Sequence, residues 1–226
     1  MSTHSFRSLW LVSAVVSVLF FSSCEEDEPA AALEAITVRN LNADYAPLVF
    51  GSNGPPTRPT ETRKYTFFSF KTGDIVPNAD SASLKWDIAF RATSIIFNSG
   101  TSGPGNAGAQ FLSGTLDAIT EAPESGYAVD NAPQGAAPVF AVSPSPLASG
   151  ATPTNQWWQN SGSAQSTIVS PIAGRILVVR LAEGGFAKME ILSYYENAPA
   201  QPNNLSDKDR HFTFRYVYQP NGGRTF

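Results

Sequence analysis

The sequence predicts an all-β protein: a single domain of antiparallel hairpins with a loop-lined ligand cleft and little helix. Two observations favour this class. Apolar residues recur with a period of two in several segments, as they do along strands. No stretch of any length repeats apolar residues at the 3.6-residue spacing of an amphipathic helix. With 226 residues, of which 42% are hydrophobic, the chain is long enough to bury one sizeable core.

The clearest element is a hairpin over residues 175–195, with the sequence RILVVRLAEGGFAKMEILSYY. Both strands alternate, and residues 183–185 form the turn because glycine reaches positive φ without steric cost. Met189 has apolar neighbours in the second strand, so we expect it to fill the core and not to bind a metal. Lys188 and Glu190 share one face, which is predicted to meet water. The hairpin is therefore predicted to be scaffold at the centre of a sheet.

Six further segments are predicted strands on the same grounds: residues 34–40, 64–71, 84–91, 93–98, 109–112 and 211–218. In the third of them, LKWDIAFR, alternation places Trp86, Ile88 and Phe90 inside. Asp87 then falls on the opposite, solvent-facing side. Residues 41–63 are predicted to form a loop, because Pro, Gly, Asn and Thr are frequent there.

The start of the chain is predicted to be a targeting sequence and not part of the folded domain. Residues 1–23 have the pattern of a secretory signal peptide, with an apolar run over 9–21 that is too short to span a bilayer as a mature helix. The ending LFFSSC resembles a bacterial lipobox, in which Cys24 becomes the lipidated first residue. Residues 24–33 are then a lipidated cysteine and acidic tether, and residues 34–226 are the β domain.

The charges of the mature chain exclude one class of partner. Once residues 1–23 are removed, 14 Lys and Arg and 19 Asp and Glu remain, because Arg7 is the only charged residue lost. Four of these acids form the run at residues 25–28, so the folded part is close to neutral. Nucleic-acid binding, which needs a basic stripe, is not expected. The acidic run is either a solvated spacer or, by its resemblance to Bacteroidetes lipoproteins, a signal for export to the cell exterior.

The residues that usually carry catalysis are sparse. After the signal peptide, His211 is the only histidine, and we expect it on a solvent-facing or rim position of its strand. No G-x-S-x-G elbow and no cluster of zinc ligands occurs. The glycine-rich residues 99–108 lack the Gly-Lys-Ser/Thr of a phosphate loop and are predicted to be a flexible hairpin end. Asp87 and Glu190 each lie two residues from a lysine, so ion pairs are expected. The chain is predicted not to be an enzyme.

Residues 127–172 differ from the rest of the chain. They are rich in Ala, Pro, Ser and Gly and contain no long alternating run. Long irregular stretches in compact domains often carry function. The candidate ligand-binding residues are the aromatic ones, Tyr127, Phe140, Trp157 and Trp158. The tryptophan pair has two interpretations: an exposed binding surface, or packing of at least one ring under its own loop.

Five motifs give the chain a resemblance to a known family. They are KWDIAF at 85–90, NSGTSGPGNAG at 98–108, SGYAVD at 125–130, RILVVR…FAKMEILSYY at 175–195 and HFTFRYVYQPNG at 211–222. Together they resemble the HmuY family, haem-binding surface lipoproteins of Bacteroidetes, over most of residues 60–222. The resemblance implies an all-β fold shaped like a half-closed hand, with haem gripped between loop-bearing hairpins. It also implies a hemophore that passes haem to an outer-membrane receptor, expected to be TonB-dependent.

The chain departs from the family where the iron ligands are expected. Members clamp the haem iron with two axial His or Met side chains from the segment before the RILVVR-like strand. Here residues 128–172 contain no His, Met, Cys, Tyr or Lys. Residues 160–163, where the resemblance places a histidine, are Asn, Ser, Gly and Ser, which are weak partners for haem iron. No Lys or Arg occurs between Arg91 and Arg175, so this segment has no cation for haem propionates.

These residues leave two hypotheses. In the first, the chain is a haem-binding, hemophore-like lipoprotein of haem and iron acquisition that holds haem by apolar stacking. Any iron ligand then comes from outside the segment, with Tyr127, Met189 and His211 as the weak alternatives. In the second, the same scaffold binds another apolar or planar ligand, a glycan or a partner protein, without haem. In both, Cys24 anchors the chain in the outer membrane, facing the cell exterior.

Overall fold

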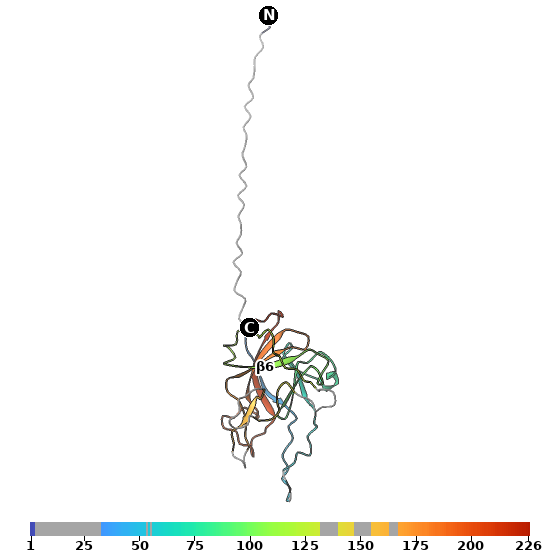
Figure 1. Cartoon of the computed structure of the whole chain (residues 1–226), viewed down its shortest axis with the longest axis vertical. Helices are drawn as coiled ribbons and strands as arrows, with labels where there is room; N and C mark the ends of the chain where they lie inside the picture. Colours follow the sequence, from blue (N-terminus) through green and yellow to red (C-terminus); the bar gives the residue numbers. More distant parts are fainter. Residues whose placement is uncertain (3–32, 53, 55, 132–139, 147–154, 163–166) are drawn as a thin grey trace. The chain divides into compact units, whose positions relative to one another are not determined.

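The structure is a computed structural model, and the chain divides into two compact units, Met1–Ala31 and Ala32–Phe226. It describes residues 1–2, 33–52, 54, 56–131, 140–146, 155–162 and 167–226. The predicted signal peptide, Cys24 and the acidic run at 25–28 lie outside the described residues. The strands drawn in Figure 1 belong to the second unit.

In the described residues, the regular structure consists of eleven strands and one short 3-10 helix. Their bounds are β1 Ile36–Asn42, β2 Thr66–Ser69, β3 Asp74–Val76, η1 Asn78–Asp80, β4 Ile88–Arg91, β5 Ser94–Phe97, β6 Gly108–Ser113, β7 Trp158–Asn160, β8 Val169–Pro171, β9 Arg175–Arg180, β10 Phe186–Ser193 and β11 His211–Gln219. The predicted all-β class is confirmed. Residues 125–130 join β6 through a single bridge, Ala109 to Ala128, and form no strand of their own.

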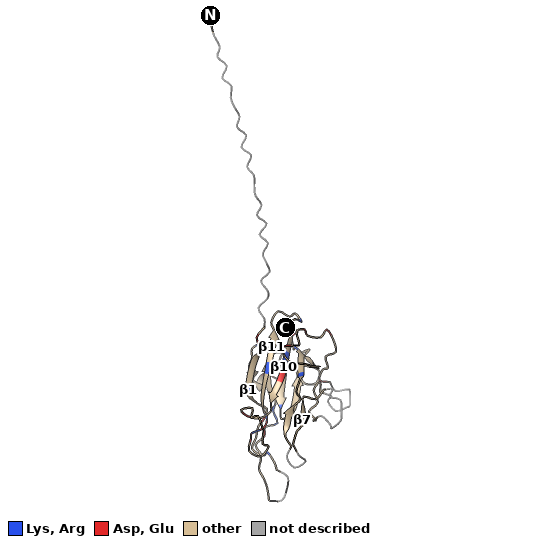
Figure 2. Cartoon of the chain, turned by 90° about the vertical axis from the view of Figure 1, so that its left-hand side faces the viewer, with Lys and Arg blue, Asp and Glu red and all other residues tan. Residues whose placement is uncertain are grey.

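The strands form three antiparallel sheets. The largest has the order β1-β11-β10-β9-β6, the second has β3-β2-β4-β5, and β7 and β8 form a third. Figure 2 shows β1, β11 and β10 side by side in the largest sheet. The β9–β10 hairpin lies at its centre, as predicted, and Met189 pairs with Leu177 across it. Gly184 and Gly185 have φ of 95° and 80°, which explains the two glycines of the turn.

The main core lies between the two large sheets. Phe68 of β2, Phe90 of β4 and Phe214 of β11 are all buried there. The ring of Phe214 lies 5.4 Å from that of Phe68 and 5.6 Å from that of Phe90. Rings at these separations attract each other in addition to the hydrophobic gain of burial. The aromatic alternation of β2, β4 and β11 thus explains how the sheets are held together.

A second apolar cluster covers the outer face of the four-stranded sheet, and it corrects the prediction for residues 84–91. Trp86 and Ala89 pack in this outer cluster, whereas Ile88 and Phe90 face the main core. Asp87, predicted to face solvent, is only 6% exposed. The period of two assigns residues to alternate faces, but it does not reveal that both faces of this sheet are covered.

The buried carboxylate of Asp87 joins the two large sheets. It accepts the backbone N–H of Phe70, at the end of β2, at 3.0 Å and that of Ala182, beyond β9, also at 3.0 Å. Burial raises the pKa of Asp87 above its ordinary value. The predicted ion pair of Asp87 with a lysine is wrong, because Lys85 pairs with Asp80 at 3.0 Å.

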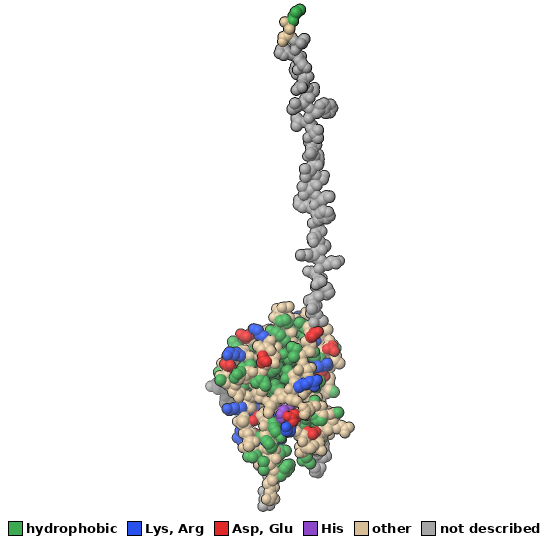
Figure 3. All heavy atoms as spheres, turned by 180° about the vertical axis from the view of Figure 1, so that it is seen from behind, with side chains coloured by type: hydrophobic (Ala, Val, Ile, Leu, Met, Phe, Trp, Pro, Cys, Tyr) green, Lys and Arg blue, Asp and Glu red, His purple; other side chains and the backbone are tan. Residues whose placement is uncertain are grey.

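The charged face of β10 also differs from the prediction. Lys188 is 5% exposed, and its Nζ donates to the backbone oxygen of Ile119 at 2.9 Å. Glu190 pairs with Arg215 of β11 at 2.8 Å, not with Lys188. A third apolar cluster that includes Leu116 covers this side of the five-stranded sheet, so Lys188 does not meet water. On the face in Figure 3, cations and anions are interspersed, in keeping with the near-neutral composition.

Candidate functional site

The described parts of residues 127–172 are hydrogen-bonded to the turn between β4 and β5. Thr93, in that turn, accepts a hydrogen bond from Nε1 of Trp157 at 2.8 Å and donates to the backbone oxygen of Pro144 at 3.2 Å. The same Pro144 oxygen accepts from Nε1 of Trp158 at 3.1 Å. Because both indole N–H groups are satisfied inside the protein, the pair works as an anchor for the segment.

Both tryptophans are buried, Trp157 at 2% and Trp158 at 7% exposure. Trp157 packs against Phe212 of β11, with ring centroids 5.0 Å apart. The structure therefore excludes the interpretation of the pair as an exposed surface, and both rings pack inside the protein. Contact of either ring with a ligand stays a prediction.

The structure does not bring the four aromatic candidates together. Tyr127 packs against Phe186 on the outer face of the five-stranded sheet, and its hydroxyl donates to the backbone oxygen of Pro123 at 3.0 Å. Burial raises the pKa of Tyr127 to about 12. Phe140 packs on the outer cluster of the four-stranded sheet. Since the Trp pair lies in the main core, the candidates occupy three separate places.

Met189 and His211, two of the three weak iron donors named from the sequence, are both buried in the fold. Met189 has no exposed surface and lies in the main core, as predicted. His211 is 6% exposed, so the predicted solvent-facing or rim position is wrong. Its ring lies 5.2 Å from that of Tyr45, which covers it, and Nδ1 is 2.7 Å from the backbone oxygen of Asp209. Among the residues described, no group of three or more His, Cys, Asp and Glu could hold a metal ion.

The glycine-rich loop is neither an open anion cradle nor a free hairpin end. Asn98 is fully buried, and its side chain bonds the backbone oxygens of Ser83 and Trp86 and the N–H of Gly105 at 2.8 to 2.9 Å. A Cβ at Gly103 would lie 2.2 Å from Oδ1 of Asn98. The glycines are therefore needed so that the loop can wrap closely around this amide.

Two hollows border the described parts of the segment on the side of β6. One has a volume of about 270 Å³ and is walled by Phe111, Val142 and Leu177, among others. The other, against Trp157 and Met189, has a volume of only about 10 Å³. Small-molecule pockets usually have about 300 to 1,000 Å³. The second hollow is thus a packing gap, and the first alone is smaller than a usual ligand site.

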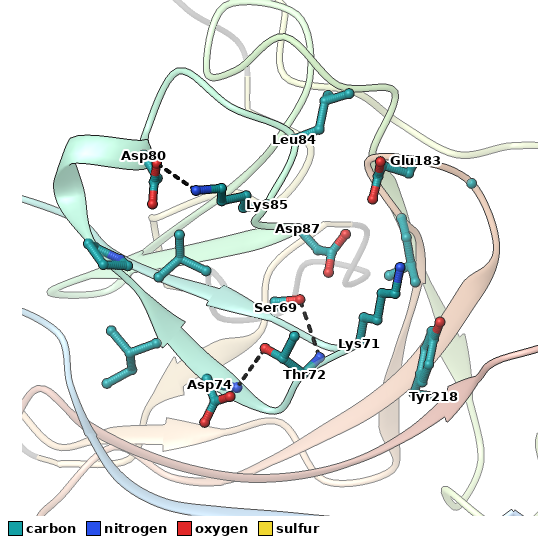
Figure 4. Close-up of a pocket in the computed structure, with 15 residues that line it drawn as sticks. Ser69, Lys71, Thr72, Asp74, Asp80, Leu84, Lys85, Asp87, Glu183 and Tyr218 are labelled. Carbon is teal, nitrogen blue, oxygen red and sulfur yellow. Dashed lines mark hydrogen bonds and ion pairs between the residues drawn. The ribbon is translucent and has the colours of Figure 1, made fainter.

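A larger cavity lies where the β2–β3 hairpin meets the β9–β10 turn (Figure 4). Its volume is about 470 Å³, and its lining mixes apolar side chains with charged ones. Ile75 and Leu84 are 59% and 43% exposed at this cavity, and the buried Asp87 belongs to its lining. Sequence reasoning missed it because its walls come from turns far apart in the chain. None of the predicted site residues lines it.

Two further hollows share Glu61, Arg63 and Arg210, and we treat them as one groove. Their volumes are about 430 and 720 Å³. Four arginines line this arginine groove: Arg58, Arg63, Arg91 and Arg210. They come from the loop after β1, the end of β4 and the residue before β11, so no sequence motif marks them.

Comparison with known proteins identifies one family. The model of the family described as HmuY protein matches residues 61–216. A search of curated proteins gives no match.

Solved structures of Bacteroidetes proteins match most of this chain at low sequence identity. A Bacteroides vulgatus protein described as HmuY-like and heme-binding is 14% identical, with a TM-score of 0.44, and the match covers 81% of this chain and 90% of the other. A Bacteroides fragilis protein described as a lipoprotein is 14% identical, with 82% of this chain and 90% of the other covered and a TM-score of 0.42. The apo HmuY analogue of Tannerella forsythia is 15% identical, with 84% and 96% covered and a TM-score of 0.40.

Proposed function

Because the chain belongs to the HmuY family, we propose that it is a surface haem-binding lipoprotein of haem acquisition that holds haem without two strong axial ligands. The family match covers residues 61–216, which include every strand from β2 to β10 and part of β11. This membership supports a haem-binding role. The manner of binding follows from the residues of this chain.

One observation carries the proposal: the strong iron donors are absent from the segment where the family places them, and the three candidate donors outside it are held by the fold. Residues 128–172 contain no His, Met, Cys, Tyr or Lys. Outside the segment, Met189 is enclosed in the core, and His211 is buried with Nδ1 at a backbone oxygen. The hydroxyl of Tyr127 is also engaged, and its raised pKa disfavours the phenolate that would bind iron. Without iron ligation, affinity comes from contacts with the porphyrin itself, and apolar burial is the first of them.

The anchoring of the protein is part of the proposal. Cleavage before Cys24 would leave a lipidated cysteine, and the multiple acyl chains of bacterial lipoproteins suffice for stable attachment. In the part of the chain that the structure describes, there is no helix with the length and apolar character to span a bilayer. Residues 25–28 would direct the protein to the outer face of the outer membrane, where a TonB-dependent receptor takes over the haem. A Cys24→Ala variant should lose incorporation of labelled fatty acid, while a Ser22→Ala variant should keep it.

The proposed activity is binding and transfer, without catalysis. The test is a titration with ferric haem followed by absorbance. We expect a broadened, weakly shifted Soret band with no six-coordinate low-spin spectrum. A low-spin spectrum complete at one equivalent would contradict the proposal, because it needs two strong donors on the iron.

A second candidate is favoured by the cavity of Figure 4: the scaffold binds a different apolar ligand there, without haem. The cavity has the size of ordinary ligand sites, at about 470 Å³. Leu84→Asp would place a charge on its apolar wall. Under this second candidate, Leu84→Asp would abolish binding of the native ligand recovered from cells; under the haem proposal it would leave haem binding unchanged.

A further inference from the structure

We propose that the arginine groove receives the carboxylate groups of a porphyrin dicarboxylate, the ligand class that the proposed function assigns to this chain. The inference rests on the proposed function for the identity of the ligand, and it adds the place where the charged edge binds. No Lys or Arg occurs between Arg91 and Arg175, so the irregular segment carries no cation of its own. The groove supplies cations from other parts of the chain.

Two of the arginines hold the fold. Arg58 pairs with Asp209 at 2.6 Å, and its side chain is 12% exposed. Arg210 pairs with Glu61 at 3.0 Å and donates to the backbone oxygen of Asp44 at 2.9 Å. The hydrogen bond from Arg210 lowers the pKa of Glu61, which keeps this carboxylate ionised at neutral pH. Within each pair the two charges cancel, and the two arginine side chains form walls of the groove.

The other two arginines keep donors for a ligand. The side chain of Arg63 is 81% exposed, and its Nε is 3.4 Å from Glu61, which is long for a hydrogen bond. Arg91 makes no ion pair with any carboxylate of the described residues. It donates to the backbone oxygen of Arg63 at 3.1 Å and lies 4.7 Å from the ring of Tyr65. This holds the guanidinium in place while other N–H groups remain for a carboxylate.

The backbone around the groove is held in an uncommon conformation. Four of the residues that line it have positive φ: Asp44 at 63°, Arg63 at 59°, Ala92 at 48° and Arg210 at 56°. Such non-glycine residues persist only where their surroundings fix them, and they are frequent at binding sites. Here the N–H of Arg63 donates to Asp44 Oδ2 at 2.7 Å, and that of Ala92 donates to the oxygen of Ala43 at 2.8 Å. The groove is thus formed before a ligand arrives, which lowers the entropy cost of binding.

The rim of the groove is apolar. Leu48, Pro56 and Pro59 line it, and Val49 and Phe50, on the same loop, are 49% and 64% exposed. Apolar side chains beside Arg63 and Arg91, which keep N–H donors for a ligand, match a ligand with an apolar body and an anionic edge. A small hydrophilic anion such as sulfate would use the arginines and leave the rim uncovered.

The groove adjoins the segment in which the family places its haem contacts. Ala92 and Ser94 line the groove, and Thr93 between them bonds to Trp157 and Pro144 of that segment. A planar ligand that lies over this turn can therefore meet the arginines along one edge and the segment along another.

The experiment compares iron-free protoporphyrin IX with its dimethyl ester, which has the same ring without the charges. Binding is followed by quenching of tryptophan fluorescence. Arg63→Gln removes a groove charge, Arg63→Lys keeps it, and Arg39→Gln removes an exposed arginine of β1 that does not line the groove. Thermal melting verifies that each variant folds. An apolar sulfonate, anilinonaphthalene sulfonate, serves as a probe of the groove that does not depend on porphyrin binding.

We expect protoporphyrin IX to bind more tightly than the ester, and Arg63→Gln to weaken it by about three- to tenfold, as for an exposed charge-assisted contact. Arg63→Lys should restore much of the loss, and Arg39→Gln should change nothing. Equal binding of acid and ester that is insensitive to Arg63→Gln overturns the groove assignment and leaves the proposed function standing. If neither porphyrin binds but the sulfonate does, in an Arg63-dependent manner, the proposed function fails and the groove remains an anion site. If none of the three probes binds, both fail.

Discussion

Replacing Asp87 with alanine removes the carboxylate that links the two large sheets. Two backbone N–H groups, those of Phe70 and Ala182, would lose their acceptor. Each buried donor left without a partner costs about 1 to 3 kcal/mol, so the change should cost roughly 2 to 6 kcal/mol of unfolding free energy. We expect the lower half of this range, because the raised pKa of Asp87 means that burial disfavours the ionised carboxylate in the wild type.

Asp87→Asn gives a graded comparison. Its amide oxygen keeps one of the two N–H bonds, while its NH₂ cannot accept the other, so the expected loss is about 1 to 3 kcal/mol. Asp80→Ala is the matched control on the same cavity, since the pair of Asp80 with Lys85 is largely exposed and should be worth about 1 kcal/mol or less.

Unfolding in urea at pH 7, followed by tryptophan fluorescence, measures the three variants against the wild type. The expected order of loss is Asp87→Ala, then Asp87→Asn, then Asp80→Ala. If Asp87→Ala stays within about 0.5 kcal/mol of the wild type, the carboxylate does not join the sheets and the reasoning is refuted.

Three further predictions concern stability and the core. Burial raises the pKa of the carboxyls of Asp87 and Asp130. Protonation of these groups therefore adds to the free energy of unfolding at low pH, and this addition is lost as pH rises through their folded-state pKa. Urea unfolding should therefore show the stability difference between the wild type and Asp87→Asn growing as the pH is lowered from 7 toward the ordinary aspartate pKa of 3.8, and a difference that does not change with pH would count against the prediction. Met189→Ala should cost about 2 to 5 kcal/mol and Met189→Leu less than about 1.5 kcal/mol. The haem spectrum of the leucine variant should equal that of the wild type, and a changed spectrum with unchanged stability would identify Met189 as a ligand. Trp157→Phe leaves the Thr93 oxygen without its donor and should lower the melting temperature, whereas an unchanged melting curve would show that this anchor is dispensable.

The elements that sequence predicted well are those with long alternation. The β9–β10 hairpin and β11 follow from a period of two that continues over six to nine residues. Gly184 and Gly185 mark the turn between β9 and β10, because the turn requires positive φ at both positions. In such stretches local pattern and tertiary structure agree, and the two faces of the strand can be read directly.

The errors arise where burial depends on what packs against a face. Alternation put Asp87 and Lys188 opposite apolar residues, and we inferred contact with water. Asp87 instead bridges the two large sheets through backbone N–H groups, and an outer cluster covers Lys188, whose Nζ donates to a backbone oxygen. His211 follows the same rule, since Tyr45 comes from a distant loop that a strand pattern does not place.

The candidate site was only partly predictable. The irregular segment was singled out by composition, and the absence of strong iron donors in it is a property of the sequence. The arginine groove was not predictable, because its members are brought together by loops with positive φ. Sequence left two interpretations of Trp157 and Trp158 open, because a pair of large aromatic residues suits a binding surface and a buried anchor equally, and both side chains are buried in the structure.

The most direct test of the central claim compares the affinity for ferric haem with that for iron-free protoporphyrin IX. The two ligands share the ring and both propionates and differ only in the metal. If contacts with the ring and the propionates hold the ligand, the two dissociation constants should agree within about threefold, which is less than 1 kcal/mol. A preference of a hundredfold or more for the iron form, about 2.7 kcal/mol, would mean that the protein ligates the metal and would contradict the account.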